Sequence, residues 1–188
     1  MKGIYGDRLA IEWYAFPLEQ VNSSRGAEWK LWEQPDAYES KGLWALRAGE
    51  AARLQGEKLF ERLHIALLRA KHVEKNDIAN REALIGLARE EGLDMDKFRA
   101  DLLSRKLLAK IGADYTRGVE EHGVWGTPTL VFNGRHAAYL KLKPAPPPEE
   151  SVKVFEELFD LIHGRPYVIE VKRPRLPQTY VSPFKTGI

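Results

Sequence analysis

The ten residues GVWGTPTLVF, at positions 123–132, constrain the fold more than any other stretch of the chain. A strand inside a sheet needs its backbone N–H groups for hydrogen bonds, so proline is confined to strand entrances, edges and bulges. Pro128 therefore marks the entrance of a strand. The peptide bond before a proline can be cis as well as trans at a small cost in free energy. The stretch predicts a loop of defined shape that leads directly into a strand.

The residues that follow predict an antiparallel hairpin. PTLVFNG at 128–134 ends in an Asn-Gly turn dipeptide, and AAYLKL follows at 137–142. An Asn-Gly dipeptide between two such stretches is a strong hairpin signal. Near the start of the chain, RLAIEWYAF at 8–16 mixes β-branched and aromatic residues in near-alternation and stops at a proline, which predicts another strand. A short strand is also predicted for YVIEV at 167–171.

Residues 24–122 have a helical pattern instead, because apolar residues recur there every three or four positions. Asp94 is an N-cap candidate for a long helix, with a bend at Gly112 and an end at Gly123. A last helix is predicted over 148–164, since a proline and two glutamates suit a first helical turn. The order is thus a strand, many helices, a hairpin and a closing helix.

Composition narrows the class of protein. The chain has 188 residues, of which 44% are hydrophobic, so it can bury one core, with or without a large insertion. The 29 Lys and Arg against 27 Asp and Glu leave a net charge of +2, which gives no argument for a nucleic-acid partner or an anionic membrane. No apolar run approaches the ~20 residues that span a bilayer, and the start lacks the apolar region of a secretory signal. A cytoplasmic protein without a membrane partner is therefore predicted.

The chain contains no cysteine. These residues therefore supply no disulfide, no thiolate metal ligand and no thiol nucleophile. The five histidines have no metal-binding spacing, so no metal site is predicted. Of the five tryptophans, Trp125 alone lies in a predicted loop; packing is predicted for Trp13, Trp29, Trp32 and Trp44.

Three stretches together resemble a known family: EWYAFPLEQVN at 12–22, NDIANREALIGLAREEGLD at 76–94 and EEHGVWGTPTLVFNG at 120–134. They are similar to the DsbA-like family of thioredoxin-fold proteins. Within it, the resemblance is to FrnE-type oxidoreductases and to hydroxychromene carboxylate isomerases, which are related to kappa-class glutathione transferases. The resemblance covers residues 4–164.

This resemblance implies an α/β, thioredoxin-like fold with a large all-helical insertion. Residues 1–22 and 123–164 would form the thioredoxin-like core, residues 23–122 the insertion, and residues 165–188 an extended C-terminal arm. In the family, G-V-x-G-T-P-T is a cis-proline loop beside the active site. The resemblance therefore implies a binding role for four residues: Trp125, Gly126, Thr127 and Pro128.

The family also carries a cysteine or serine at the start of its first helix, after its first strand. The present sequence resembles the family only beyond that unit, so we expect the first β-α unit to be missing and the catalytic residue to be absent from the chain. The start could be truncated, the chain could be a thiol-free relative in which 8–16 pairs with 128–133, or a strand could come from another chain. Truncation is favoured, because a strand over 8–16 needs partners for its backbone.

The family chemistry implied is thiol–disulfide exchange, with a thiol- or disulfide-containing protein or a small-molecule thiol as partner. One alternative is a glutathione-dependent isomerase or transferase, for which glutathione would be the cofactor; otherwise no cofactor is predicted. Another is a non-catalytic module that binds peptides or thiols. A homodimer is compatible with all three. Two cysteines before the present start would favour exchange, and a lone serine would favour glutathione.

Overall fold

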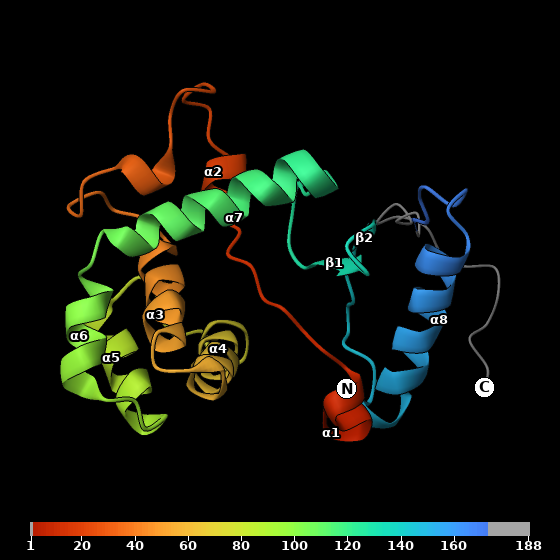
Figure 1. The fold of residues 1–188 in the computed structure, drawn as a ribbon, viewed down its shortest axis with the longest axis horizontal. Helices are drawn as coiled ribbons and strands as arrows, with labels where there is room; N and C mark the ends of the chain where they lie inside the picture. Colours follow the sequence, from red (N-terminus) through yellow and green to blue (C-terminus); the bar gives the residue numbers. More distant parts are fainter. Residues whose placement is uncertain (1, 173–188) are drawn as a thin grey trace, which may run out of the picture. The chain divides into compact units, whose positions relative to one another are not determined.

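The computed structural model describes residues 2–172. Contacts within the chain divide it into two compact units, Met1–Pro144 and Ala145–Ile188. The first unit is mostly helical and holds a two-stranded sheet (Figure 1). The domain division expected from the sequence stays a prediction, and most of the expected C-terminal arm, residues 173–188, lies outside the described part of the chain.

The first unit begins with a short helical segment and continues through a run of longer helices to the hairpin. Its elements are α1 (Lys2–Tyr5), η1 (Gly6–Arg8), α2 (Leu18–Val21), η2 (Leu31–Glu33), α3 (Leu43–Arg53), α4 (Glu57–His72), α5 (Arg81–Glu90), α6 (Met95–Leu102), α7 (Lys106–His122), β1 (Thr129–Phe132) and β2 (His136–Tyr139). The second unit contains η3 (Pro148–Glu150) and α8 (Ser151–Gly164).

Helix α3 lies at the centre of the first unit and contacts α4, α5, α6 and α7 (Figure 1). Its alanines Ala48, Ala51 and Ala52 are completely buried, and their small side chains allow neighbouring helices to approach closely. Leu63 of α4 and Leu84 of α5 complete the same core and are also inaccessible to solvent. Buried leucines at helical spacing thus form the core that the sequence pattern predicts.

The expected long helix after residue 94 is two helices. Asp94 is the predicted N-cap, and its side chain accepts hydrogen bonds from the backbone N–H groups of Asp96 and Lys97. However, α6 ends at Leu102 and α7 begins at Lys106. Helix α6 packs with α3, α4 and α5, whereas Leu108 and Ile111 of α7 pack with η2 and the start of α3. Leu107, at the start of α7, still belongs to the core of α6, so α7 contributes to both clusters.

The strand predicted over 8–16 is wrong. Residues 9–16 are extended, but the sheet in residues 2–172 consists of β1 and β2, and the segment pairs with neither. Side chains of the helices bind its backbone instead. The Ala15 N–H donates to Asp114 Oδ2 at 3.1 Å, and Arg53 Nη2 donates to the Trp13 carbonyl at 3.0 Å.

The predicted hairpin is confirmed. β1 and β2 are antiparallel, in a register that runs from Thr129 opposite Tyr139 to Phe132 opposite His136. Asn133 and Gly134 both have positive φ angles, 50° and 68°, which suit an Asn-Gly turn. β2 is shorter than expected, because its regular pairing ends at Tyr139.

In the second unit the closing helix is confirmed, with η3 and α8 in sequence after Pro147. The strand predicted over 167–171 is wrong: that segment is irregular, and Tyr167 and Ile169 are 77% and 96% exposed. A strand without a partner strand leaves its backbone unpaired, so the β-branched pattern alone was not sufficient.

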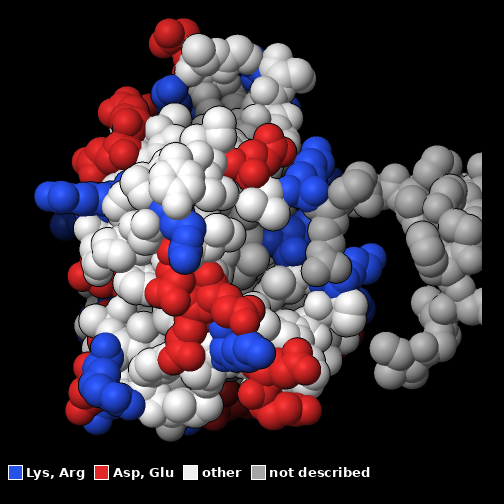
Figure 2. All heavy atoms as spheres, turned by 90° about the vertical axis from the view of Figure 1, so that its right-hand side faces the viewer, with Lys and Arg blue, Asp and Glu red and all other residues white. Residues whose placement is uncertain are grey.

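The surface carries charges of both signs. Figure 2 shows Lys and Arg interspersed with Asp and Glu on the face that it presents, as the small net charge of +2 would suggest. Across residues 2–172, no helix is both long enough and apolar enough to cross a membrane.

Candidate functional site

The loop of interest begins where α7 ends. Gly123 terminates the helix in a left-handed conformation, with a φ of 61°, and its N–H donates to the Val119 carbonyl at 3.1 Å. The next N–H, that of Val124, donates back to the Gly118 carbonyl at 2.9 Å. These two bonds satisfy helix carbonyls and direct the chain from α7 into the loop 123–128.

The end of α7 is also tied to the extended segment 9–16. Arg117 Nη1 donates to the Tyr14 hydroxyl at 2.8 Å, while its Nε donates to Glu121 Oε2 at 3.1 Å. The hydrogen bond to Glu121, followed by that to Tyr14, raises the pKa of Arg117. The side chain therefore stays charged and holds both partners.

Trp125 and Tyr139 form an exposed aromatic pair. Their ring centroids are 4.4 Å apart, and the two residues are 64% and 39% exposed. Gly126 is buried beneath Tyr139, and a Cβ on it would lie 3.1 Å from Tyr139 Cε2. A side chain at position 126 would therefore press on the tyrosine ring, which lies across the loop.

The backbone of Thr127 is exposed and has no hydrogen-bond partner among the described residues. Thr127 and Pro128 are exposed, and the peptide bond between them is cis. Neighbouring groups are occupied: the Thr129 hydroxyl donates to the Gly126 carbonyl at 2.7 Å, and the Leu140 N–H donates to the Pro128 carbonyl at 3.0 Å. No hydrogen bond within residues 2–172 uses the N–H or C=O of Thr127.

Alternate residues of β1 also have backbone N–H and C=O groups that do not pair with β2. In an antiparallel pair, every second residue directs its backbone N–H and C=O groups toward the partner strand. The bond between Pro128 and Leu140 fixes this alternation, so Thr129 and Val131 direct theirs away from β2. Thr127, Thr129 and Val131 thus form a row of unpaired backbone groups, here called the open edge of β1.

All four residues expected at the site, Trp125 to Pro128, lie together on this loop, as their sequence proximity requires. Sequence reasoning missed Tyr139. The signal was present: an Asn-Gly turn fixes the register of the hairpin, and that register places Tyr139 opposite Thr129 at the loop. The other tryptophans pack as predicted; Trp44 is 9% exposed and lies in the core.

Comparisons with known proteins agree with this geometry. The family profile described as Thioredoxin matches residues 18–143. The chain belongs to the thioredoxin family. The match confirms a thioredoxin-like fold with a large helical part. The finer resemblance, to FrnE-type oxidoreductases and to the isomerases, stays a prediction.

One curated relative is named as an adapter protein. The chain is 28% identical over 151 residues to the ClpXP adapter protein SpxH of Bacillus subtilis (strain 168). The alignment covers 79% of this chain and 50% of that protein. The chain therefore spans about half the length of the curated relative that it matches.

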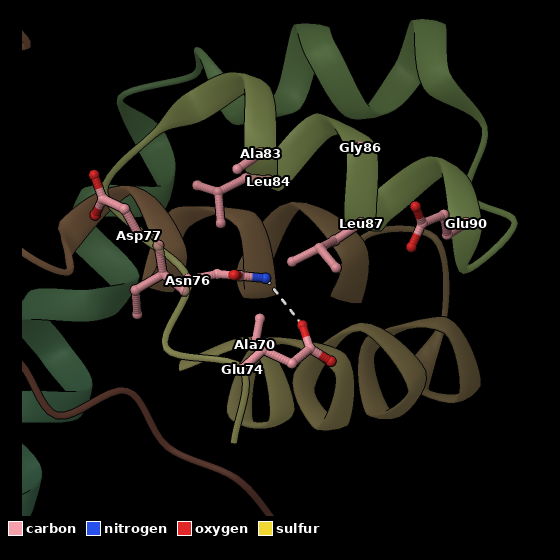
Figure 3. A pocket seen from close by; sticks show the side chains of 10 residues that line it. Ala70, Glu74, Asn76, Asp77, Ala83, Leu84, Gly86, Leu87 and Glu90 are labelled. Atoms are coloured by element: carbon pink, nitrogen blue, oxygen red, sulfur yellow. Dashed lines mark hydrogen bonds between the residues drawn. The ribbon is translucent and has the colours of Figure 1, made fainter. Parts of the chain in front are cut away.

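A concave site also lies between the end of α4 and one face of α5 (Figure 3). Its volume is about 380 Å³. Leu84 and Leu87 form part of its floor, and Glu74, whose carboxylate accepts a hydrogen bond from Asn76 Nδ2 at 2.9 Å, lies at its rim. Within the described residues, no group of three or more His, Asp or Glu side chains could hold a metal ion.

Proposed function

We propose that this chain is the partner-binding part of a cytoplasmic thioredoxin-family protein, and that it holds an extended segment of another protein at the backbone of Thr127, where the loop enters β1. The observation that carries the proposal is that this backbone is exposed and unpaired. An extended peptide that adds to a sheet edge forms main-chain hydrogen bonds that need no particular side chain. Thr127 offers such bonds at the point where the loop enters β1.

The aromatic pair beside this row supports the proposal. Trp125 is the most exposed tryptophan that the structure describes, and it stacks on Tyr139 rather than packing in a core. Large aromatic side chains contribute much of the binding energy at protein interfaces. In this arrangement the partner's backbone pairs with Thr127, while one of its apolar side chains packs on Trp125.

The name of the relative supports a binding role as well, since SpxH is described as an adapter. The similarity is modest and covers half of that protein, so it supports the class of role and not a particular partner. The partner is therefore defined here by the chemistry of the site alone.

Thiol–disulfide exchange is the second candidate, and the family match favours it. The exchange requires a thiolate that attacks a disulfide, and the 188 residues contain no cysteine. In that case Thr127 would hold the backbone next to the partner's reactive sulfur, and the attacking thiol would come from outside these residues. Glutathione chemistry would use the same loop for a small thiol.

An array of 12-residue peptides tests the proposal, with bound sequences then measured in solution by calorimetry. The variant Trp125→Ala should weaken binding at least tenfold. The matched control is Val73→Ala, because Val73 is also an exposed apolar side chain, 73% exposed, but lies just after α4. Equal loss in both variants, or no loss in Trp125→Ala, would contradict the proposal.

A further inference from the structure

The cavity between the end of α4 and one face of α5 shares no residue with the loop 123–128, and the proposed function does not use it (Figure 3). Its volume of about 380 Å³ lies within the range of roughly 300–1,000 Å³ that is usual for small-molecule pockets. Its walls come from two helices that pack against each other and from the connection between them. The cavity is therefore a second candidate site, of a size that suits a small ligand.

The floor of this cavity is apolar. Leu87 and Glu90 are three residues apart, so they lie on the same face of α5, along the cavity. Leu84 and Ala70 line it from the two helices and are 0% and 1% exposed. A Cβ on Gly86, which also lines the cavity, would meet no atom within 4 Å, so there is open space at this position. The methylene groups of a ligand would fit against such a floor.

Three carboxylates border the floor, and none of them is paired with a cation of residues 2–172. Glu74 accepts a hydrogen bond from Asn76 Nδ2, and Asp77 accepts one from the Ala79 N–H, both at 2.9 Å, and both donors are neutral. The Glu90 side chain has no hydrogen bond or ion pair with another described residue. The described residues that line the cavity include no Lys, Arg or His. The cavity thus carries negative charge that no contact neutralises.

Neighbouring cations are bound elsewhere. Lys75 follows Glu74 in the sequence, but its Nζ donates to the His72 carbonyl. Arg62 of α4 donates from Nε to Glu91 at 3.1 Å. Glu91 takes no part in lining this cavity. The chain's own side chains therefore leave the three carboxylates available to a cationic ligand.

The carboxylates are spread along the cavity and are not gathered at one point. In Figure 3, Asp77 and Glu90 lie at opposite ends of the row of lining side chains, with Leu84 and Leu87 between them. Asp77 precedes α5 and Glu90 is its last residue, so ten helical residues, roughly 15 Å at about 1.5 Å per residue, separate them. Within the described chain, no three His, Asp or Glu side chains come together as a metal site. A single compact cation would meet only part of this charge.

We propose that this cavity binds a linear aliphatic polyamine, whose ammonium groups pair with Glu90, Glu74 and Asp77 while its methylene chain lies on Leu84 and Leu87. The inference is independent of the proposed function. Separated carboxylates match separated ammonium groups, and the apolar floor between them matches the methylenes that connect those groups. A monoamine satisfies one end of the cavity only, and a divalent metal ion has no apolar part.

Calorimetric titration of the 188-residue chain with spermidine at low salt tests the proposal. Spermidine should bind at least tenfold more tightly than hexylamine, which has a methylene chain but one ammonium group. It should also bind at least tenfold more tightly than Mg²⁺, which has charge without a chain. The affinity should fall in 0.5 M salt, because salt screens exposed charge pairs. Backbone NMR shifts on addition of spermidine should be largest around Asn76, Gly86 and Leu87.

Variants of the chain test the charge and the shape of the cavity separately. Glu90→Gln should weaken spermidine binding at least fivefold. The matched control is Glu28→Gln, because Glu28 is an exposed glutamate between α2 and η2, and it should leave the affinity unchanged. Gly86→Leu keeps every charge but adds a side chain at the open position of the wall, so it should also weaken binding at least fivefold.

The remaining outcomes would contradict the proposal. Equal binding of spermidine and Mg²⁺, or equal loss in Glu90→Gln and Glu28→Gln, would show attraction to negative surface charge in general. Unchanged affinity in Gly86→Leu would place the bound polyamine outside the cavity. If Nα-acetyl-lysine amide binds as tightly as spermidine, the cavity would be assigned to a lysine side chain of a partner protein instead.

Discussion

The indole of Trp32 lies against the backbone of Gly112, so closely that a Cβ on Gly112 would be 2.6 Å from Trp32 Nε1. This contact holds η2 against the middle of α7, beside the ring of Tyr115 at 5.3 Å from that of Trp32. Gly112 was expected to bend the helix. Its absent side chain instead allows close packing, and the helix continues through it.

The contact predicts opposite effects for two helical glycines. Gly112→Ala should lower the free energy of unfolding by about 1–3 kcal/mol, because the added methyl group displaces a packed indole. Gly86→Ala in α5 should raise it by up to about 1 kcal/mol, because alanine favours the helix. A Cβ on Gly86 would meet no atom within 4 Å. Urea unfolding of both variants is the measurement, and equal effects would contradict the packing argument.

The anchor of the extended segment gives a second prediction. Asp114 is 6% exposed, accepts the Ala15 N–H and pairs with Lys110. Asp114→Ala should lower the free energy of unfolding by about 1–3 kcal/mol, since it leaves a buried backbone donor without a partner. The control is Asp101→Ala, which removes an ion pair with Lys97 that has the same spacing but is more exposed. This variant should lower the free energy of unfolding by no more than about 0.5 kcal/mol. Faster hydrogen exchange at the Ala15 amide should accompany only the first variant.

The pH dependence of stability should depend on His64. Burial, and then the charge of Arg53, lowers the pKa of His64. Its Nε2 is buried without a hydrogen-bond partner, between the rings of Trp13 and Phe60. The unfolded chain therefore binds a proton more readily than the folded chain, and the free energy of unfolding should fall as pH decreases through the ordinary histidine pKa of 6.5.

Glutamine does not titrate. When the pH is lowered from 7.5 to 5, the free energy of unfolding of His64→Gln should therefore decrease less than that of the unchanged chain. Burial also raises the pKa of Glu50, which acts with the opposite sign above pH 4.5, but Glu50 is present in both proteins and cancels in the comparison. His72→Gln, at an exposed position of α4, is the control. An identical pH profile for His64→Gln and the unchanged chain would contradict the account.

The absence of cysteine predicts the outcome of a redox assay. The 188-residue chain should reduce insulin disulfides no faster than a control without protein, because no thiolate is available for the attack. Turbidity measured with dithiothreitol as reductant is sufficient. A rate that increases with the concentration of the chain would show that residues other than cysteine perform the reaction.

The parts of the fold that rest on local chemistry were predictable. The Asn-Gly turn predicts the hairpin, Asp94 predicts the start of α6, and Gly123 predicts the end of α7; the structure confirms all three. Each depends on residues that lie within a few positions of one another. For the same reason, the loop 123–128 could be identified as a site before Tyr139 was known to lie across it.

The errors arose where distant partners decide the structure. The alternating pattern of residues 8–16 indicates that one side of the segment is buried, as Ala15 is. The pattern does not indicate whether another strand lies beside the segment. Asp114 binds its backbone from 99 residues away along the chain, and Arg53 from 40 residues away. The surroundings of α6 and α7 likewise depend on two clusters of buried residues that are distant in sequence, and no local window of sequence contains either cluster.

The central claim is that a partner's backbone pairs with the backbone of Thr127. Hydrogen exchange measured by NMR tests it directly, with a 12-residue peptide that binds in the array as the probe. In the free chain, the amides of Thr129 and Val131 should exchange faster than that of Leu130, which faces β2. With saturating peptide, the amide of Thr127 should become protected, whereas that of Leu130 should change little. A bound peptide that leaves the Thr127 amide unprotected would contradict the account.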